Sequence, residues 1–240
     1  MATGTDASAA PRDSAAVILV RDAGSAVGLE VLLVRRHRKA SFMSSSYVFP
    51  GGVAEPGESD RAAAARELAE ETGVRLPDLE GLHYFAHWIT PSIEPRRYSA
   101  RFFVAALPPD QTITLEPREI EDAVWATPDG ALARSAELRL PPPQIRTLIE
   151  MGPAAREGRA GLVALCAERD AALHAILPRA AQTQGGLTLL LPWDPDYDAV
   201  GQGAALSLPA GHPLAVGPSR FVLEDSAWKH IDAPTSARAV

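Results

Sequence analysis

Three glutamates on one turn of an expected helix constrain this chain more than any other feature. Residues 60–72 read DRAAAARELAEET, and the alanine run gives this segment a high helix propensity. Within it, Glu67 stands three residues before Glu70 and four before Glu71. Like charges at these spacings lie side by side on a helix and destabilise it by roughly 0.2–0.5 kcal/mol per pair. We therefore expect another group to offset the repulsion.

Clustered carboxylates favour the binding of a hard divalent cation. Mg²⁺ takes carboxylate oxygens, waters and substrate phosphates as its ligands. Gly51 and Gly52 come shortly before the helix, and without side chains their backbone can approach a cation or a phosphate closely. The pattern predicts phosphoryl chemistry on a small anionic substrate, with Mg²⁺ as cofactor. The competing interpretation is an ordinary solvated, glutamate-rich helix face.

The spacing of fixed residues around the glutamates resembles the signature of the Nudix hydrolases. Gly52 is followed after five residues by Glu58 and after seven more by RELAEETGV, residues 66–74. These 23 residues match every fixed position of that signature. The resemblance implies an α/β fold, namely an α/β/α sandwich around a mixed central sheet. It also implies hydrolysis of a nucleoside diphosphate linked to another moiety, with Mg²⁺ or Mn²⁺ as cofactor.

Carried over by position, the resemblance implies a role for each residue of the signature. Arg66 would orient the catalytic carboxylate, Glu67, through an ion pair, and Glu58 and Gly73 would be structural. The implied reaction is in-line attack of an activated water on one phosphorus of the diphosphate. The implied metal ligands are the carbonyl of Gly52 and the carboxylates of Glu67, Glu70 and Glu71.

The general base is expected outside the signature, because many members of the family place it in an acidic loop before a later strand. The corresponding segment reads TLEPREIEDAVW, residues 114–125. We favour Glu119, which lies six residues before Trp125, over Glu116 and Glu121. The alternative for each of these three is a surface carboxylate without a role in catalysis.

Further segments resemble the coenzyme A diphosphatase-like branch of the family, of the peroxisomal type. Residues 32–52 fit the extended motif of that branch at two leucines, an arginine and the FPGG end, and depart from it at Ser41 and Ser45. Residues 88–105 and 140–148 are similar to the corresponding segments of its peroxisomal members. The resemblance implies coenzyme A or an acyl derivative as substrate, cleaved to 3′,5′-ADP and 4′-phosphopantetheine. ADP-ribose, NADH or a nucleotide sugar is the alternative substrate, and a nucleotide sensor without catalysis is a second alternative function.

Arginines and aromatic residues in and near these segments are candidates for substrate binding. Arginine meets phosphate through charge-assisted hydrogen bonds, and Trp88 or Tyr98 can stack on adenine. In the competing interpretation, the aromatic residues build the core and the arginines solvate a sheet edge. The candidates are Arg36, Gly51, Trp88, Arg96, Arg97 and Arg101.

Charge and cysteine content limit the remaining possibilities. A net charge of −7 argues against partners such as nucleic acid or an anionic membrane. The expected partner is a small nucleotide, and family analogy favours a homodimer. Cys166 is the only cysteine, which excludes an intramolecular disulfide. Because no apolar run approaches the ~20 residues of a membrane span and the N-terminus lacks a signal-peptide pattern, the expected location is cytoplasmic.

We expect one domain with appendages. Residues 1–13 should be disordered, and residues 14–177 should form the Nudix domain with its C-terminal helices. Residues 178–240, rich in proline and glycine, should pack on it as an extension with one or two short strands. Strands are predicted at residues 15–22, 29–37, 46–52, 82–90, 97–107 and 121–127. Helices are predicted at residues 60–72, capped by Ser59 and Gly73, and at residues 128–134, 141–152 and 161–176.

Overall fold

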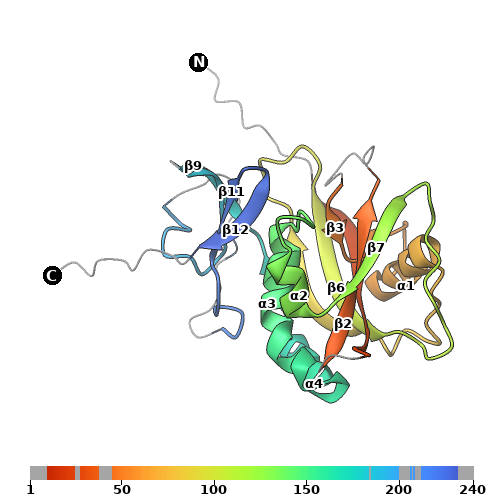
Figure 1. Cartoon of the computed structure of the whole chain (residues 1–240). Coiled ribbons are helices and arrows are strands. Elements are labelled where there is room, and N and C mark those ends of the chain that lie inside the picture. The colour runs from red at the N-terminus through yellow and green to blue at the C-terminus, as the bar shows by residue number, and fades with distance from the viewer. Residues whose placement is uncertain are drawn as a thin grey trace.

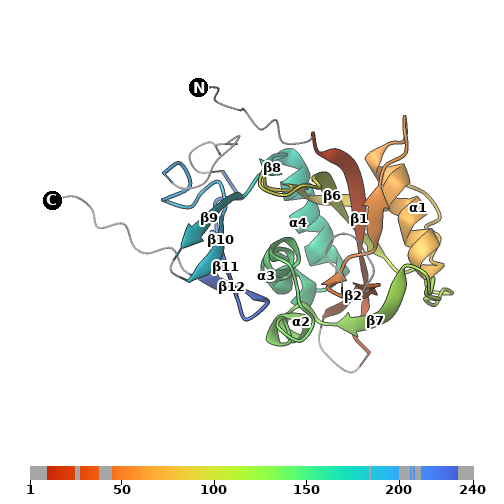
Figure 2. The same cartoon turned by 90° about the horizontal axis from the view of Figure 1, so that it is seen from above.

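The protein is a mixed β-sheet between helices, with a second, smaller sheet beside it (Figures 1 and 2). In this computed structural model, α1 (Asp60–Thr72) covers one face of the main sheet and three helices cover the other. The three are α2 (Pro128–Ala133), α3 (Pro142–Arg156) and α4 (Arg159–Ala171). The expected α/β/α architecture is confirmed. The structure describes residues 10–24, 28–37, 45–183, 185–199, 206, 208 and 212–231.

The main sheet has eight strands in the order β3-β2-β1-β6-β5-β8, with β4 paired to β1 and β7 paired to β2. The β1/β6 and β5/β8 pairs are parallel and the other pairs are antiparallel, so the sheet is mixed as expected. The strands are β1 (Arg12–Asp22), β2 (Leu29–Arg36), β3 (Tyr47–Val48), β4 (Gly51–Val53), β5 (His83–Ile89), β6 (Tyr98–Ala106), β7 (Ile120–Ala126) and β8 (Ala175–Ile176).

The central strand β1 is buried on both of its faces. Ile18 and Val20 face the hydrophobic core under α2, α3 and α4, whereas Val17 and Leu19 face the core under α1. All four side chains are at most 2% exposed. A strand that is covered on both faces needs a continuous apolar run instead of an alternating pattern. The segment AAVILV provides such a run and places β1 at the centre of the sheet.

The helix α1 begins and ends where the sequence predicts. Ser59 Oγ accepts a hydrogen bond from the Ala62 amide at 3.3 Å, which satisfies one of the free N–H groups of the first turn. Gly73 ends the helix with a φ of 72°, a left-handed conformation that glycine adopts without a steric penalty. Buried Ala63 and Leu68 pack against the sheet. The helix is therefore held in one register beside β4.

Some boundaries differ from the predicted ones because partners distant in the sequence decide them. The strand β1 begins at Arg12, three residues earlier than predicted, because its parallel ladder with β6 starts there. Gly51–Val53 form a separate strand that pairs with β1. The prediction of one helix over residues 161–176 is wrong at its end: α4 stops at Ala171, and Ala175–Ile176 pair with β5 as β8.

The structure describes only part of the predicted N-terminal appendage. Most of the expected disordered start falls on residues 1–9, which lie outside the described residues, while its last two residues, 12 and 13, belong to β1. No helix within the described part of the chain is long and apolar enough to span a membrane.

The extension after the last helix contains a complete second sheet, so the prediction of one or two short strands is wrong. Four antiparallel strands pair in the order β12-β11-β10-β9. The hairpin between β11 and β12 turns at Asp225 and Ser226, both with positive φ, where hairpin turns usually carry glycine. This turn therefore gives no glycine signal in the sequence. The strands are β9 (Arg179–Thr183), β10 (Gly186–Leu190), β11 (Arg220–Glu224) and β12 (Ala227–Ile231).

The second sheet packs on α3 and shares a hydrophobic core with the main domain (Figure 1). Arg146 on α3 is 1% exposed and donates hydrogen bonds to the carbonyls of Leu214 at 2.8 Å and Pro218 at 3.0 Å. Its guanidinium also lies 3.9 Å from the ring centroid of Trp193. Within the domain, the same side chain is paired with Glu150. A buried arginine thus joins the extension to the helix layer.

A half-buried histidine in β5 makes the stability of this fold depend on pH. The pKa of His87 is lowered to about 4, chiefly by burial and also by the nearby charge of Arg101, while Asp13 opposes the shift. Its Nε2 lies 2.9 Å from Ser99 Oγ, and His174 is a further neighbour. In the unfolded chain the histidine pKa is about 6.5. The unfolded state therefore binds more protons between these two values, and stability falls as pH decreases through that window.

We expect His87→Gln to reduce this pH dependence. Glutamine keeps a neutral polar group near Ser99 but cannot be protonated. In urea unfolding at pH 7 and pH 5, the wild-type protein should lose more stability on acidification than the variant does. Equal losses in the two proteins would show that His87 is not the group responsible.

Candidate active site

The carboxylates of α1 meet the backbone of β4 at the edge of the main sheet. Glu71 is 5% exposed, and its Oε2 accepts a hydrogen bond from the Gly51 amide at 2.9 Å. Glu67 lies against Gly52, where an added Cβ would stand only 2.4 Å from the Glu67 carboxyl carbon. A larger residue at this position would displace the Glu67 carboxylate. The two glycines and the two glutamates therefore form one unit, as the signature implies.

Arg66 organises the signature by contacting four groups at once. Its Nε and Nη2 donate to the two carboxylate oxygens of Glu58, each at 3.0 Å. Its Nη1 donates to Glu67 at 2.8 Å and to Glu70 at 3.1 Å, and Nη2 also donates to the Val53 carbonyl at 3.0 Å. The planar guanidinium is suited to such paired contacts, which an ammonium group cannot reproduce. The contact with Glu67 is the ion pair expected from the sequence, and Glu58 lies in the loop before the helix.

The charge of Glu119 acts on both Glu67 and Glu71. The pKa of Glu71 is raised to about 8, chiefly by burial and also by the charges of Glu67 and Glu119, while the hydrogen bond from Gly51 and the charge of Arg36 oppose the rise. Burial also raises the pKa of Glu67, with Arg66 opposing and Glu119 contributing. Glu119 is exposed, and it directly precedes β7. Among the candidates for a general base, Glu119 is thus the one whose charge acts on both Glu67 and Glu71.

The carboxylates fit a hard cation by their chemistry but need rearrangement to surround one. Within the described ranges, no three His, Cys, Asp or Glu side chains are already grouped to hold a metal ion. Glu70 is turned toward Arg66, and Glu71 is bonded to the Gly51 amide. Burial raises the pKa of Glu67 and Glu71 although Arg66 and Arg36 oppose the rise, so further positive charge would stabilise their ionised forms. A divalent cation would supply that charge, so the donor set fits Mg²⁺ or Mn²⁺.

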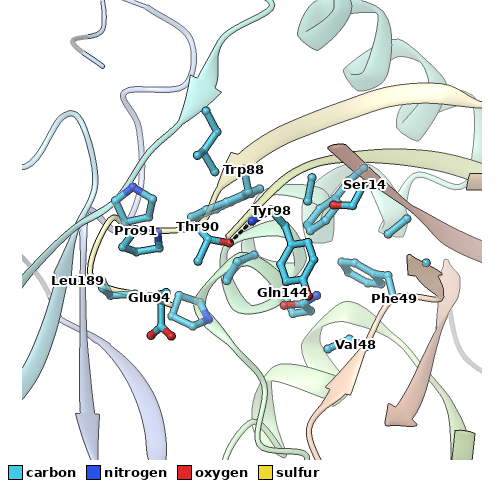
Figure 3. A pocket seen from close by; sticks show the side chains of 18 of the residues that line it. Ser14, Val48, Phe49, Trp88, Thr90, Pro91, Glu94, Tyr98, Gln144 and Leu189 are labelled. Atoms are coloured by element: carbon cyan, nitrogen blue, oxygen red, sulfur yellow. Dashed lines mark hydrogen bonds between the residues drawn. The ribbon is translucent and has the colours of Figure 1, made fainter. Parts of the chain in front are cut away.

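A cavity of about 490 Å³ opens from the glycine strand toward the second sheet. Figure 3 shows Trp88 and Tyr98 in this cavity, with Phe49 toward one side and Leu189 toward the other. Gly51, Gly52 and Arg36 line the part nearest the carboxylates. Much of the remaining lining is aromatic or aliphatic: Phe49, Trp88, Tyr98, Phe102, Leu189 and Trp228. Its volume lies within the range of small-molecule sites.

The structure divides the predicted substrate-binding residues into two groups. Arg36, Gly51 and Trp88 line the cavity. Arg96 is exposed on the loop that borders it, and Arg97 Nε donates to the Thr90 carbonyl at 3.0 Å. The structure does not bring Arg101 to the cavity: its Nη1 lies 3.3 Å from Asp60 and 3.7 Å from Asp13.

The sequence-based prediction missed much of the lining of this cavity, including three residues in the C-terminal half of the chain. They are Gln144 on α3, Leu189 on β10 and Trp228 on β12. Gln144 is 6% exposed, and its Oε1 has no hydrogen-bond partner among the residues that the structure describes. Gln144 stands within the segment LPPPQIRTL, whose likeness to the peroxisomal branch was the one available signal. Leu189 and Trp228 carry no motif.

Comparison with known proteins agrees with this geometry. Residues 10–147 match the family model described as NUDIX domain. A Caenorhabditis elegans nudix hydrolase is 29% identical over 162 residues, which cover 50% of this chain and 55% of that protein. A Stutzerimonas stutzeri protein named NAD-capped RNA hydrolase NudC is 33% identical over 151 residues, covering 62% of this chain and 48% of its own. The chain thus spans about half the length of these curated relatives.

A solved structure matches the same region. The crystal structure of a NUDIX hydrolase from Alicyclobacillus acidocaldarius superposes with a TM-score of 0.55 and 24% identity. The match covers 60% of this chain and 92% of that one, so it supports the fold. The family model covers more than half of the 240 residues and includes the glutamate helix. The chain belongs to the Nudix hydrolase family.

Proposed function

We propose that this protein hydrolyses the diphosphate of a nucleoside diphosphate derivative with Mg²⁺ or Mn²⁺ as cofactor. The observation that carries the proposal is the contact of two carboxylates, the buried Glu71 and the partly buried Glu67, with the Gly51–Gly52 backbone at one end of a cavity. Phosphate oxygens and a cation are the groups that such glycines and carboxylates attract. One relative is named a hydrolase of NAD-capped RNA, and NAD contains a diphosphate.

Each protein group then has a task in the reaction. Glu67, Glu70, Glu71 and the Gly52 carbonyl would hold the cation, which supplies charge neutralisation and a lowered pKa for water when it is bound. Arg66 fixes the carboxylate of Glu67 through its 2.8 Å contact. Glu119 would accept the proton of the attacking water. Arg36 lines the cavity near the glycines and would neutralise charge on the diphosphate.

We propose coenzyme A or an acyl derivative as the substrate. The support is the upstream motif, whose Arg36 lines the cavity, together with the arginine-bearing loop that borders it. ADP-ribose, NADH and nucleotide sugars contain the same diphosphate and are the competing substrates. A sensor without catalysis is the less favoured alternative, because all four acids of the signature, Glu58, Glu67, Glu70 and Glu71, are present.

A panel of diphosphates tests both the hydrolysis of a diphosphate and the assignment of coenzyme A as substrate. Coenzyme A, dephospho-coenzyme A, ADP-ribose and NADH are incubated with the protein and Mg²⁺, and products are identified by mass. If an arginine recognises the 3′-phosphate, dephospho-coenzyme A lacks a charge-assisted contact of about 1.5–3 kcal/mol. Its kcat/KM should then be about 10–150-fold lower than that of coenzyme A. Arg96→Ala should reduce the difference in kcat/KM between coenzyme A and dephospho-coenzyme A and leave ADP-ribose cleavage unchanged. A higher kcat/KM for ADP-ribose than for coenzyme A would overturn the coenzyme A assignment alone.

A further inference from the structure

The C-terminal sheet forms one wall of the cavity that begins at the signature glycines. Leu187 and Leu189 from β10 and Trp228 from β12 line it, together with Pro178 just before β9. Phe49 lies on the opposite side (Figure 3), and Gly51 and Gly52 of β4 also line the cavity. Without the extension, the cavity would therefore be open on this side.

The lining differs between the two ends of the cavity. Arg36 stands with the glycines at the end where a diphosphate would lie. Toward the extension, the lining consists mostly of Trp, Leu, Ile and Pro side chains, and its charged member is Glu94. Figure 3 shows Glu94 on the same side as Leu189 and away from Phe49. An acidic residue among apolar ones disfavours anionic groups, so a neutral and apolar group fits this end.

The wall is held in place by buried contacts. Leu189 belongs to the same hydrophobic core as Ile145 and Leu148 of α3. The hydrogen bonds of Arg146 to the Leu214 and Pro218 carbonyls attach the segment before β11 to the same helix. Because these groups are buried, the wall is a fixed surface of the kind that preformed ligand sites have. Gln144, in the first turn of α3, also lines the cavity, and its amide oxygen has no hydrogen-bond partner among the described residues.

We infer that the C-terminal sheet completes the substrate pocket, and that Leu189 and Trp228 determine specificity by binding an uncharged, apolar group linked to the diphosphate. This inference rests on the proposed function for the position of the diphosphate. It assigns a role to the extension that the Nudix signature does not contain. The substrate class is a nucleoside diphosphate with an apolar substituent.

Binding of two matched probes tests the inference. ADP esterified on its terminal phosphate with a hexyl group is compared with the methyl ester, which differs only in apolar length. Calorimetric titration in EDTA measures Kd without turnover. We expect the hexyl ester to bind the wild-type protein at least about tenfold more tightly, because its additional methylene groups are buried against apolar side chains. Trp228→Ala should reduce that preference to below about threefold, with the methyl ester unaffected.

Two further variants separate specificity from folding. Trp228→Phe keeps an aromatic surface and should restore most of the preference. Ile231→Ala changes an exposed residue of the same strand, 38% exposed and outside the cavity lining, and should leave the preference unchanged. Thermal unfolding of each variant confirms that the second sheet is intact. If Trp228→Ala unfolds the extension, Trp228→Leu in a folded protein replaces it and should show a reduced preference.

The possible results distinguish this inference from the proposed function. Equal binding of the two esters to the wild-type protein, or a preference that folded Trp228 variants retain, overturns the inference. If Mg²⁺-dependent hydrolysis still occurs in that case, the proposed function stands. If the preference depends on Trp228 but neither the esters nor any diphosphate of the panel is hydrolysed with Mg²⁺, the inference stands and the proposed function fails.

Discussion

Turnover of the diphosphate substrate is expected to fall by roughly 10³-fold when Glu71 is changed to glutamine. A bound cation contributes several kcal/mol to the stabilisation of a phosphoryl transition state, and each 1.36 kcal/mol corresponds to tenfold in rate. Glutamine has the size of glutamate but is a poor ligand for a hard cation. Glu70→Gln should have an effect of similar direction, because Glu70 is the third carboxylate of the set. Steady-state rates at subsaturating Mg²⁺ provide the measurement.

Stability measurements exclude unfolding as the cause of such a loss. The amide oxygen of glutamine can still accept the bond from Gly51, and the substitution removes a buried carboxylate whose pKa is raised to about 8. In EDTA, Glu71→Gln should therefore be at least as stable as the wild-type protein. Glu80→Gln, at an exposed position after the helix, serves as the matched control and should retain full activity. Near-normal turnover of folded Glu71→Gln would refute the assignment of the metal site.

Glu119→Gln should lower turnover by roughly 10²–10⁴-fold, the usual contribution of a positioned general base. The reason is that glutamine cannot take the proton from the attacking water. Metal affinity should change little, because Glu119 lies outside the proposed ligand set. The Mg²⁺ concentration for half-maximal activity therefore separates this variant from Glu71→Gln, for which it should rise.

The neighbouring acids provide controls for Glu119. Glu116 Oε1 accepts a hydrogen bond from the Arg118 amide at 3.1 Å, and Glu121 lies 3.6 Å from both Arg35 and His37. Both carboxylates thus have local partners, and their glutamine variants should keep most of the activity. If one of these variants is inactive while Glu119→Gln is active, the role of general base belongs to that residue.

Local signals explain why the glutamate helix could be predicted so closely. The caps Ser59 and Gly73 act within one turn of the helix ends, and the alanine run determines the segment between them. The bounds of α1 therefore follow from thirteen residues and their neighbours. The burial of β1 on both faces could also be predicted from a local signal. Its side chains point in turn to the two cores, and a continuous apolar run is characteristic of such a strand.

Features that depend on distant partners could not be predicted in this way. Gly51–Val53 form a strand only because β1 offers them an antiparallel edge. Arg101 looks like a phosphate ligand in the sequence, yet Asp60, forty-one residues earlier, pairs with it. Trp228 and Gly51 line the same cavity although most of the sequence separates them, and the strand that contains Trp228 carries no motif. The position of the second sheet depends on buried contacts of Arg146 that no local pattern reveals.

Hydrolysis in ¹⁸O-labelled water tests most directly whether this chain cleaves diphosphates by attack of water at phosphorus. Coenzyme A and ADP-ribose are incubated separately with the protein in labelled water, with Mg²⁺ or with EDTA. The masses of the phosphate-containing products are then measured by mass spectrometry. We predict that at least one substrate is cleaved within its diphosphate only when Mg²⁺ is present, and that one ¹⁸O atom enters one of the two products. Glu71→Gln should show almost no incorporation. Cleavage that persists in EDTA, label absent from both phosphate products, or no cleavage of any diphosphate would contradict the account.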